Sequence, residues 1–169
     1  MDITGIAKSH HADIPKASSQ KEWKLSDSLR EQIAGYARED AAQGVYMGNK
    51  FLALRKSEVA KVAPDRSALM GKVDMKTIRE ADERWLRILF GEPYEAKFQS
   101  GGVHVYDGNG DEILTYTVGV GWHEKESKAE TQVHGALKAA YYDAYHAARQ
   151  EINSGIAGME VQGGFVARA

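Results

Sequence analysis

The first half of the chain carries apolar or small side chains at every third or fourth position, which is the spacing of one face of a helix. These positions are Leu29, Ile33, Ala37, Ala41, Val45, Gly48 and Leu52. The motif SLRE, residues 28–31, offers a capping box in which side chains satisfy free helix N–H groups, so we expect the helix to begin near Ser26. Pro64 ends the pattern. The sequence therefore predicts a helical region over residues 26–63.

Residues 28–63 could form one helix or two. As one helix they would run ~54 Å, whereas a compact globule of this size is only roughly 40 Å across. The helix must therefore break or project, and Gly44 and Gly48 mark the place for a break because glycine destabilises a helix interior by about 1 kcal/mol. A projecting helix would expose four apolar residues unless a second chain covered them, namely Val45, Phe51, Leu52 and Leu54. We favour the projecting helix, paired in a homodimer.

Two further helices are predicted. One runs from Asp74, a good N-cap, to Phe90, and Gly91 ends it. Its apolar stripe is Ile78, Ala81, Trp85, Ile88 and Leu89. The other begins at the capping box SKAE, residues 127–130, and reaches about Asn153. Its alanine-rich inward face is Val133, Leu137, Ala140, Ala144, Ala148 and Ile152.

The segment between these helices alternates apolar and polar residues and predicts a three-stranded antiparallel meander. Asn109-Gly110 is a strong signal for a two-residue type I′ hairpin turn. That turn pairs Asp107 with Glu112, Tyr106 with Ile113, Val105 with Leu114, and Val103 with Tyr116. A second two-residue turn at Ser100-Gly101 brings the preceding strand into the same register. The register can therefore be derived from the two turns alone.

This register separates the side chains of the meander into two faces, because residues opposite each other on neighbouring strands share a face. The apolar face carries Tyr94, Ala96, Phe98, Val103, Val105, Leu114, Tyr116, Val118, Val120 and Trp122. The mostly polar face carries Glu95, Lys97, His104, Tyr106, Ile113, Thr115 and Thr117. We therefore expect the first face to pack on helices and the second to meet solvent or a partner.

The hairpin sequence DGNGDE, residues 107–112, is acidic enough to raise the question of a cation site. A calcium loop between helices wants glycine at its sixth position and a carboxylate at its twelfth. Counted from Asp107, these positions hold Glu112 and Val118. We interpret the segment as a hairpin turn rather than as a cation site.

Together these elements predict an α+β fold: a long N-terminal helical region, a second helix, a three-stranded antiparallel meander, and a C-terminal alanine-rich helix packed on the sheet. Residues 1–22 show no helix or strand period and are interpreted as a flexible N-terminal arm. Residues 23–153 are expected to form a single domain, which includes an α-β-β-β-α unit over residues 74–153. Residues 154–169 are interpreted as a glycine-rich tail.

Composition excludes several classes of function. The chain has 169 residues, 43% of them hydrophobic and 27% charged, with a formal net charge of −2. These values are ordinary for a soluble protein and show no bias toward nucleic acid or an anionic membrane. Cysteine is absent, which excludes disulfides and thiolate chemistry. The N-terminus lacks the apolar run of a signal peptide, and no window is long and apolar enough for a membrane span. Cytoplasmic is the default expectation.

The chain carries no motif that would identify a catalytic, cofactor or metal site. It lacks a GxSxG nucleophile elbow, a GxxxxGK[ST] phosphate loop and an HExxH motif. His134 and His146 are twelve residues apart on one helix, which separates them by ~18 Å and prevents a shared metal. His104, Tyr106 and Lys97 share the polar sheet face, but the sequence shows no orienting partner for a general base there. We assign no site residue and expect no cofactor.

The order helix, three strands, helix resembles that of double-stranded RNA-binding domains, and GVGWHEKESKAE (residues 119–130) is similar to the loop and helix start with which that family binds phosphates. The family's binding requires a cluster of lysines at that helix start. Residues 123–153 instead carry four basic residues, Lys125, Lys128, Lys138 and Arg149, against five acidic ones. Nucleic acid is therefore not the expected partner.

The function that these patterns favour is a non-enzymatic structural or adaptor protein that acts through protein–protein contacts as a homodimer. Its support is the absence of catalytic motifs and the excess of helix surface with small-residue spacing. Two alternatives stay open. One is a nucleic-acid-binding module with a double-stranded-RNA-binding-like topology, and the other is a small-molecule enzyme that uses the polar sheet face.

Overall fold

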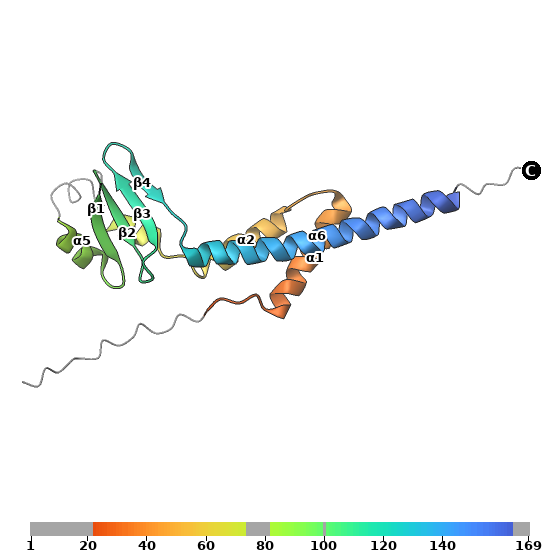
Figure 1. Cartoon of the computed structure of the whole chain (residues 1–169), viewed down its shortest axis with the longest axis horizontal. Coiled ribbons are helices and arrows are strands. Elements are labelled where there is room, and N and C mark those ends of the chain that lie inside the picture. Colours follow the sequence, from red (N-terminus) through yellow and green to blue (C-terminus); the bar gives the residue numbers. More distant parts are fainter. Residues whose placement is uncertain (1–21, 74–81, 100, 164–169) are drawn as a thin grey trace, which may run out of the picture.

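The computed structural model describes residues 22–73, 82–99 and 101–163. An antiparallel sheet lies at one end of an elongated molecule, and a single long helix extends away from it (Figure 1). The helices are α1 (Asp27–Gln43), α2 (Asn49–Ala60), α3 (Arg66–Gly71), α5 (Glu83–Phe90) and α6 (Lys128–Gly163). The strands are β1 (Glu95–Gln99), β2 (Gly102–Tyr106), β3 (Glu112–Thr117) and β4 (Gly121–Glu124). The predicted α+β class is confirmed.

The sheet has four strands in the order β1-β2-β3-β4, one more than predicted. The expected third strand is divided by a tight turn, in which the N–H of Val120 donates to the carbonyl of Thr117 (3.0 Å). Gly119 and Gly121 both adopt a positive φ that allows the turn. Val118 and Val120, predicted on the apolar face, are therefore exposed at the turn, Val120 to 83%.

The predicted register is confirmed over most of the sheet. Phe98 pairs with Val103 and Ala96 with Val105, as expected from a turn at residues 100–101. Val105 pairs with Leu114, and Val103 with Tyr116. Beyond Val105 the register shifts, so that Tyr106 pairs with Glu112 and not with Ile113. Ile113, expected on the polar face, is fully buried instead.

The shift originates in the β2–β3 turn. Asn109 does not adopt the positive φ that a type I′ turn requires, whereas Gly110 does (81°). The N–H of Gly110 donates to the carbonyl of Asp107 (3.0 Å), and the N–H of Asp107 donates to the carbonyl of Asp111 (2.9 Å). This is a three-residue loop, a type I turn followed by a left-handed glycine. The predicted two-residue turn is wrong, because the Asp107 carboxylate accepts the N–H groups of Asn109 and Asp111 and stabilises the longer loop.

The first helix begins and ends within the predicted helical region. Ser26 is the N-cap, and its Oγ accepts the N–H of Leu29 (3.2 Å), two residues before the predicted capping box. Gly44 ends α1 in a left-handed conformation (φ 69°), and α2 turns back toward the sheet (Figure 1). The favoured single projecting helix over residues 28–63 is therefore wrong. Glycine's tolerance of positive φ makes Gly44 a helix terminator.

Contacts with α6 hold this break in place. The hydroxyl of Tyr141 donates to Asp40 Oδ2 (2.6 Å) and accepts the N–H of Met47 (2.8 Å). Asp40 Oδ2 also accepts the N–H of Gly48 (2.9 Å), and a Cβ at Gly48 would overlap with the Asp40 carboxylate. Gly48 is thus required for a close approach and not for helix–helix packing.

The helix predicted over residues 74–90 is described only from Asp82. Its N-cap, Asp82, accepts the N–H of Trp85 (2.8 Å), and Gly91 ends the helix as predicted. Leu86 and Phe90 form the buried side, whereas Trp85 is exposed and Ile88 is 66% exposed. Of the predicted apolar stripe, Leu89 packs against the core, whereas the placement of Trp85 and Ile88 is wrong. Ile78 and Ala81 lie outside the described residues.

The last helix, α6, begins at the predicted capping box. The N–H of Ser127 donates to Glu130 Oε2 (2.7 Å), and the N–H of Glu130 donates to Ser127 Oγ (3.3 Å). The helix continues past Asn153 to Gly163, so the predicted tail is helical over its first residues. Its first turn meets the sheet where the N–H of Lys128 donates to Asp111 Oδ2 (2.8 Å), and its remaining buried face packs on α1 and α2.

Two apolar clusters result, one beneath the sheet and one between the helices. The sheet cluster consists of Leu69, Val73, Leu86, Phe90, Ala96, Val103, Val105, Ile113, Leu114 and Tyr116. The helical cluster consists of Ile33, Ala37, Phe51, Val133, Leu137 and Tyr141. No helix in the described part of the chain is long and apolar enough to span a bilayer.

Candidate functional site

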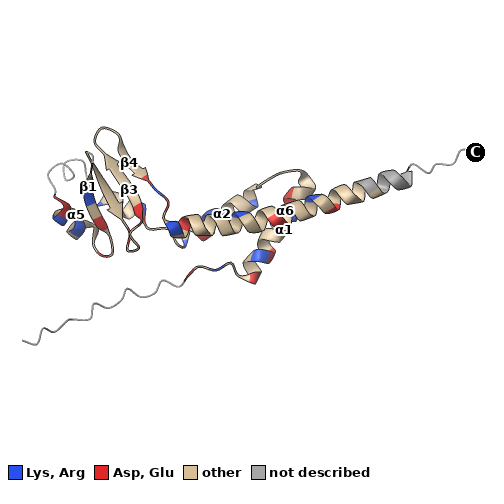
Figure 2. Cartoon of the chain, in the orientation of Figure 1, with Lys and Arg blue, Asp and Glu red and all other residues tan. Residues whose placement is uncertain are grey.

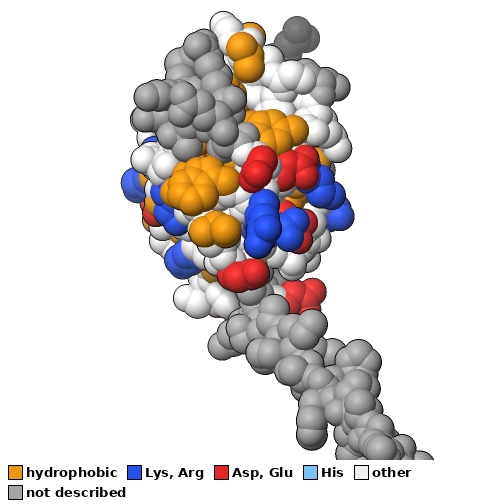
Figure 3. All heavy atoms as spheres, turned by 90° about the vertical axis from the view of Figure 1, so that its left-hand side faces the viewer, with side chains coloured by type: hydrophobic (Ala, Val, Ile, Leu, Met, Phe, Trp, Pro, Cys, Tyr) orange, Lys and Arg blue, Asp and Glu red, His pale blue; other side chains and the backbone are white. Residues whose placement is uncertain are grey.

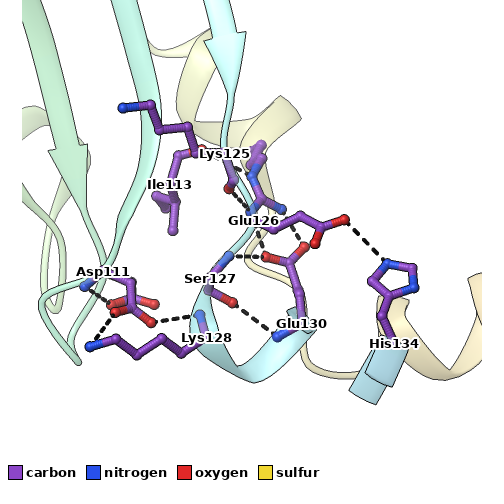
Figure 4. A network of polar contacts seen from close by, with 10 residues as sticks. Asp111, Ile113, Lys125, Glu126, Ser127, Lys128, Glu130 and His134 are labelled. Atoms are coloured by element: carbon purple, nitrogen blue, oxygen red, sulfur yellow. Dashed lines mark hydrogen bonds and ion pairs between the residues drawn. The ribbon is translucent and has the colours of Figure 1, made fainter. Parts of the chain in front are cut away.

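Polar side chains gather where the β2–β3 hairpin meets α3 and the start of α6 (Figure 4). The carboxylates of the acidic hairpin face protein donors there. Asp111 accepts the N–H of Lys128 and lies 3.3 Å from its Nζ, and Glu112 accepts Lys125 Nζ (2.6 Å). Within the described residues, no group of three or more histidine or carboxylate side chains could hold a metal ion. The acidic side chains of the hairpin thus anchor it to the residues at the start of α6.

Arg66 is at the centre of this junction. Its guanidinium donates to both carboxylate oxygens of Glu130 (2.8 and 2.6 Å), and its Nε donates to the carbonyl of Ile113 (3.1 Å). Both side chains are buried, with 9% and 6% of their surface exposed. Burial would raise the pKa of Glu130, but hydrogen bonds from Arg66 and Ser127 outweigh it and lower the pKa. The shift in register beyond Val105 is a β-bulge at Ile113, and the carbonyl of Ile113 accepts from Arg66 there. Arg66 therefore joins α3 to β3 and to α6.

A second cluster lies on the polar face of the sheet, around Glu112. Its carboxylate accepts Thr115 Oγ1 (2.6 Å) and Lys125 Nζ (2.6 Å), and it contacts His104 Nδ1. Burial would raise the pKa of Glu112, but hydrogen bonds from Lys125, Thr115 and His104 lower it to about 2. An ionised carboxylate only accepts hydrogen bonds. The His104 proton shared with Glu112 is therefore on Nδ1, and in the neutral ring Nε2 is the basic nitrogen.

The residues predicted on this face are brought together in part. His104 is opposite Lys97 on one side and Thr115 on the other, as the predicted register requires. Lys97 Nζ lies 5.1 Å from the centre of the Tyr106 ring. Glu112 was missed as the partner of His104, because the predicted turn placed it opposite Asp107. The adjacent apolar pair Ile113-Leu114, which interrupts the alternation, was the available signal for the bulge.

We expect Glu112→Gln to reduce the acid dependence of stability. The folded-state pKa of Glu112 is lowered from an ordinary 4.5 to about 2. Its contribution is therefore fully present above pH 4.5 and is lost as the pH falls toward 2. Urea unfolding across that interval should show a smaller loss of stability for Glu112→Gln than for the wild type. Gln150→Ala, an exposed substitution on α6, should keep the wild-type dependence, and an equal dependence in all three proteins would contradict the assignment.

Two of the remaining histidines, His134 and His146, have neighbours outside this cluster. His134 Nε2 lies 3.3 Å from Glu126 Oε1. The ring of His146 packs against that of Tyr142, with 4.1 Å between their centres. His134 and His146 thus contact different neighbours, in keeping with their predicted separation along one helix.

Aromatic side chains cluster where the α1–α2 loop crosses α6. Tyr46 packs edge-on against Tyr141 and Tyr145, with 5.7 and 5.1 Å between ring centres. Phe51 stacks on the other side of Tyr141 (4.2 Å). Tyr141 and Phe51 are fully buried, but Tyr46 and the neighbouring Val45 are exposed. The buried aromatic core of the helical part therefore continues to the surface at this loop.

Beyond this loop, α6 extends past the helices that cover it (Figures 1 and 2). Arg149 Nη1 donates to the carbonyl of Ala41 (3.2 Å), near the end of α1. Farther along, Ile156 is 53% exposed. A Cβ placed on Gly155 or Gly158 would meet no described atom within 4 Å outside its own turns of the helix. This part of α6 is called the distal segment, residues 149–163. The exposed side chain of Ile156 thus lies beyond the contact between α6 and the end of α1.

The opposite end of the molecule also exposes apolar side chains. Figure 3 shows hydrophobic groups there, interspersed with acidic and basic ones. Trp85 and Ile88 on α5 and Phe98 on β1 are the large exposed residues of these elements. Glu83, on the same helix, accepts the N–H of Phe98 (2.7 Å) and links α5 to the edge strand. Acidic and basic side chains therefore interrupt the apolar surface at this end.

Comparison with known proteins identifies no relative of the chain. No protein-family model, no curated protein and no solved structure matches it. Functional conclusions therefore rest on the geometry described above.

Proposed function

We propose that the chain is a structural or adaptor protein that acts through protein–protein contacts as a homodimer. The observation that carries this proposal is the distal segment of α6, which continues as a helix after its contact with Ala41 and exposes Ile156. The interface first expected along residues 28–63 is not part of the proposal, because the helix ends at Gly44 and does not project as one rod. The contact is assigned to α6 instead.

The composition of the distal segment supports a covering partner. Isolated helices shorter than about 12–15 residues are marginal in water, and each interior glycine destabilises a helix by about 1 kcal/mol. Gly155 and Gly158 both lie inside this helical stretch. Burial of Ile152 and Ile156 against a second chain would offset these costs.

The two alternatives have less support. Of the lysines near the start of α6 that a phosphate backbone would need, Lys125 forms an ion pair with Glu112. Lys128 is largely exposed and lies 3.3 Å from Asp111. The polar sheet face does orient His104 through Glu112. A ligand or substrate on that face stays a prediction. Among the described residues, no group of three or more histidine or carboxylate side chains could hold a metal ion beside His104.

Light scattering at micromolar concentration tests the homodimer. We expect a mass close to twice the 18.6 kDa of one chain. Ile156→Glu should shift the mass toward one chain, because it places a charge in the apolar contact. Ser154→Glu is the matched control, since it lies on the opposite side of the same helix and should leave the mass unchanged. A wild-type protein that stays monomeric at high concentration would rule out the homodimer.

A further inference from the structure

The polar face of the sheet carries a row of side chains that crosses all four strands. Lys97 on β1 is opposite His104 on β2, and His104 is opposite Thr115 on β3. Thr115 is in turn opposite His123 on β4. Residues directly opposite each other share a face, so these four side chains lie together. The two histidines are on either side of Thr115, with their Cα atoms about 10 Å apart because they are two strand spacings from each other.

Glu112 determines which nitrogen of His104 accepts a proton. Its ionised carboxylate contacts Nδ1, which leaves Nε2 of the neutral ring as the acceptor. A carboxylate that holds an imidazole in this tautomer is the arrangement of a general base. His123 is exposed on the other side of Thr115, and in its protonated form it can donate where His104 accepts. The row therefore offers a base and an acid on one surface.

The nucleophile for such a pair has to come from the substrate. Thr115 Oγ1, the hydroxyl between the two histidines, donates its proton to Glu112 (2.6 Å) and not to His104. RNA carries its own nucleophile, because the 2′-hydroxyl of each nucleotide adjoins a phosphodiester. In-line attack needs a base at the attacking oxygen and an acid at the leaving oxygen, on opposite sides of the phosphorus. The position of the two histidines across Thr115 meets that requirement.

Charge and aromatic surface beside the row suit an unpaired strand of RNA. Lys97 is exposed, and its Nζ lies 5.1 Å from the centre of the Tyr106 ring. Glu95 is opposite Tyr106, two positions along the strands from the histidines. The charge of Glu112 is offset by Lys125 Nζ (2.6 Å), which limits repulsion of a phosphate. A cation for the backbone beside a ring for a base is the combination with which proteins bind single strands.

We infer that the polar face of the sheet cleaves single-stranded RNA by proton transfer at His104 and His123, in a reaction that requires no metal ion. His104 Nε2 takes the proton of the 2′-hydroxyl, and the 2′-oxygen forms a bond to phosphorus. The bond from phosphorus to the 5′-oxygen breaks, and His123 gives its proton to that oxygen. The products are a 2′,3′-cyclic phosphate and a 5′-hydroxyl. Glu112 is a positioning residue, and this activity does not depend on the proposed homodimer.

Incubation of the full chain with a labelled single strand of RNA in the presence of EDTA tests the inference. We expect cleavage of the RNA, with the cyclic phosphate end identified by mass spectrometry, and no cleavage of the same sequence as DNA, which lacks the 2′-hydroxyl. His104→Ala should slow cleavage about 10²–10⁴-fold, the range for loss of a general base. His146→Ala is the matched control, since its ring packs on Tyr142 of α6, and should keep the wild-type rate.

Three further variants separate the roles of the side chains. Lys97 and His123 are both exposed, so variants there should fold. Lys97→Ala should raise KM at an unchanged kcat, and His123→Ala should lower kcat. Glu112→Gln should lower kcat at a nearly unchanged KM, because the ring of His104 loses its orientation while the contacts with RNA stay.

The remaining outcomes overturn the inference. No cleavage by the wild type would remove the activity, and an equal rate in His104→Ala would assign the cleavage to a contaminant. A wild-type rate in His123→Ala would exclude the acid. Equal cleavage of DNA would make water the nucleophile in place of the 2′-hydroxyl. None of these results changes the mass measured by light scattering, so the homodimer is tested separately.

Discussion

Arg66→Ala is expected to lower the free energy of unfolding by about 3–5 kcal/mol, since removal of one partner leaves the other as an uncompensated buried charge. That partner is Glu130, which has only 6% of its side chain exposed. The substitution also removes one donor to the carbonyl of Ile113, which keeps the N–H of Lys125 as its other donor. Urea or guanidinium unfolding followed by circular dichroism measures the change.

Two further variants test whether the cost of Arg66→Ala comes from an unpaired buried charge. Lys50→Ala disrupts an ion pair of similar length, Lys50 with Glu39 (2.6 Å), but both side chains are at least half exposed. Its cost should be much smaller than that of Arg66→Ala, because water screens an exposed ion pair. Replacement of both buried partners, Arg66→Met with Glu130→Met, should recover part of the loss because no charge is left in the interior. Similar losses for Arg66→Ala and Lys50→Ala would contradict a buried junction.

Phe51→Ala is expected to cost about 3–5 kcal/mol, the range for an aromatic truncation in a packed core. Phe51 is fully buried, and it stacks on Tyr141, which in turn holds the α1–α2 break through Asp40. The truncation thus removes a fully buried α2 side chain that stacks on α6. The same unfolding measurement applies to this variant.

The neighbouring Leu52 provides the matched control for Phe51. It belongs to the same helix but is 39% exposed, so Leu52→Ala should cost about 1 kcal/mol or less. Hydrogen exchange should show that Phe51→Ala loosens α1, α2 and α6 more than the sheet, which has its own apolar cluster. Equal costs for the two substitutions would mean that α2 is not anchored through Phe51.

Local signals in the sequence predicted the features that depend on neighbouring residues. The capping box at residues 127–130 and the helix end at Gly91 require only side chains within one turn of the helix. The pairing of Phe98 with Val103 and of Val105 with Leu114 follows from two turns and the alternation of apolar residues. Where the physical cause of a feature lies within a few residues in the sequence, the local sequence pattern was sufficient to predict that feature.

The incorrect predictions have causes that are distant in the sequence or specific to one side chain. The break at Gly44 is held by Tyr141, about a hundred positions away, which no periodicity in α1 could indicate. The bulge depends on which N–H groups the Asp107 carboxylate accepts, and the bulge brings Glu112 to His104. The sequence therefore indicated His104 and Thr115 of the candidate site on the sheet face, but not their shared partner Glu112.

The junction around Arg66 has a mechanical consequence for the far end of α6. The helix begins inside that network and is ~54 Å long over its 36 residues at 1.5 Å per residue. A rod of this length acts as a lever, so a tilt of about 5° at the junction displaces the tip by about 5 Å. Small adjustments in the hydrogen bonds of Arg66 would thus be magnified along the helix, so that the orientation of the α6 tip depends on the geometry of the junction beside the sheet.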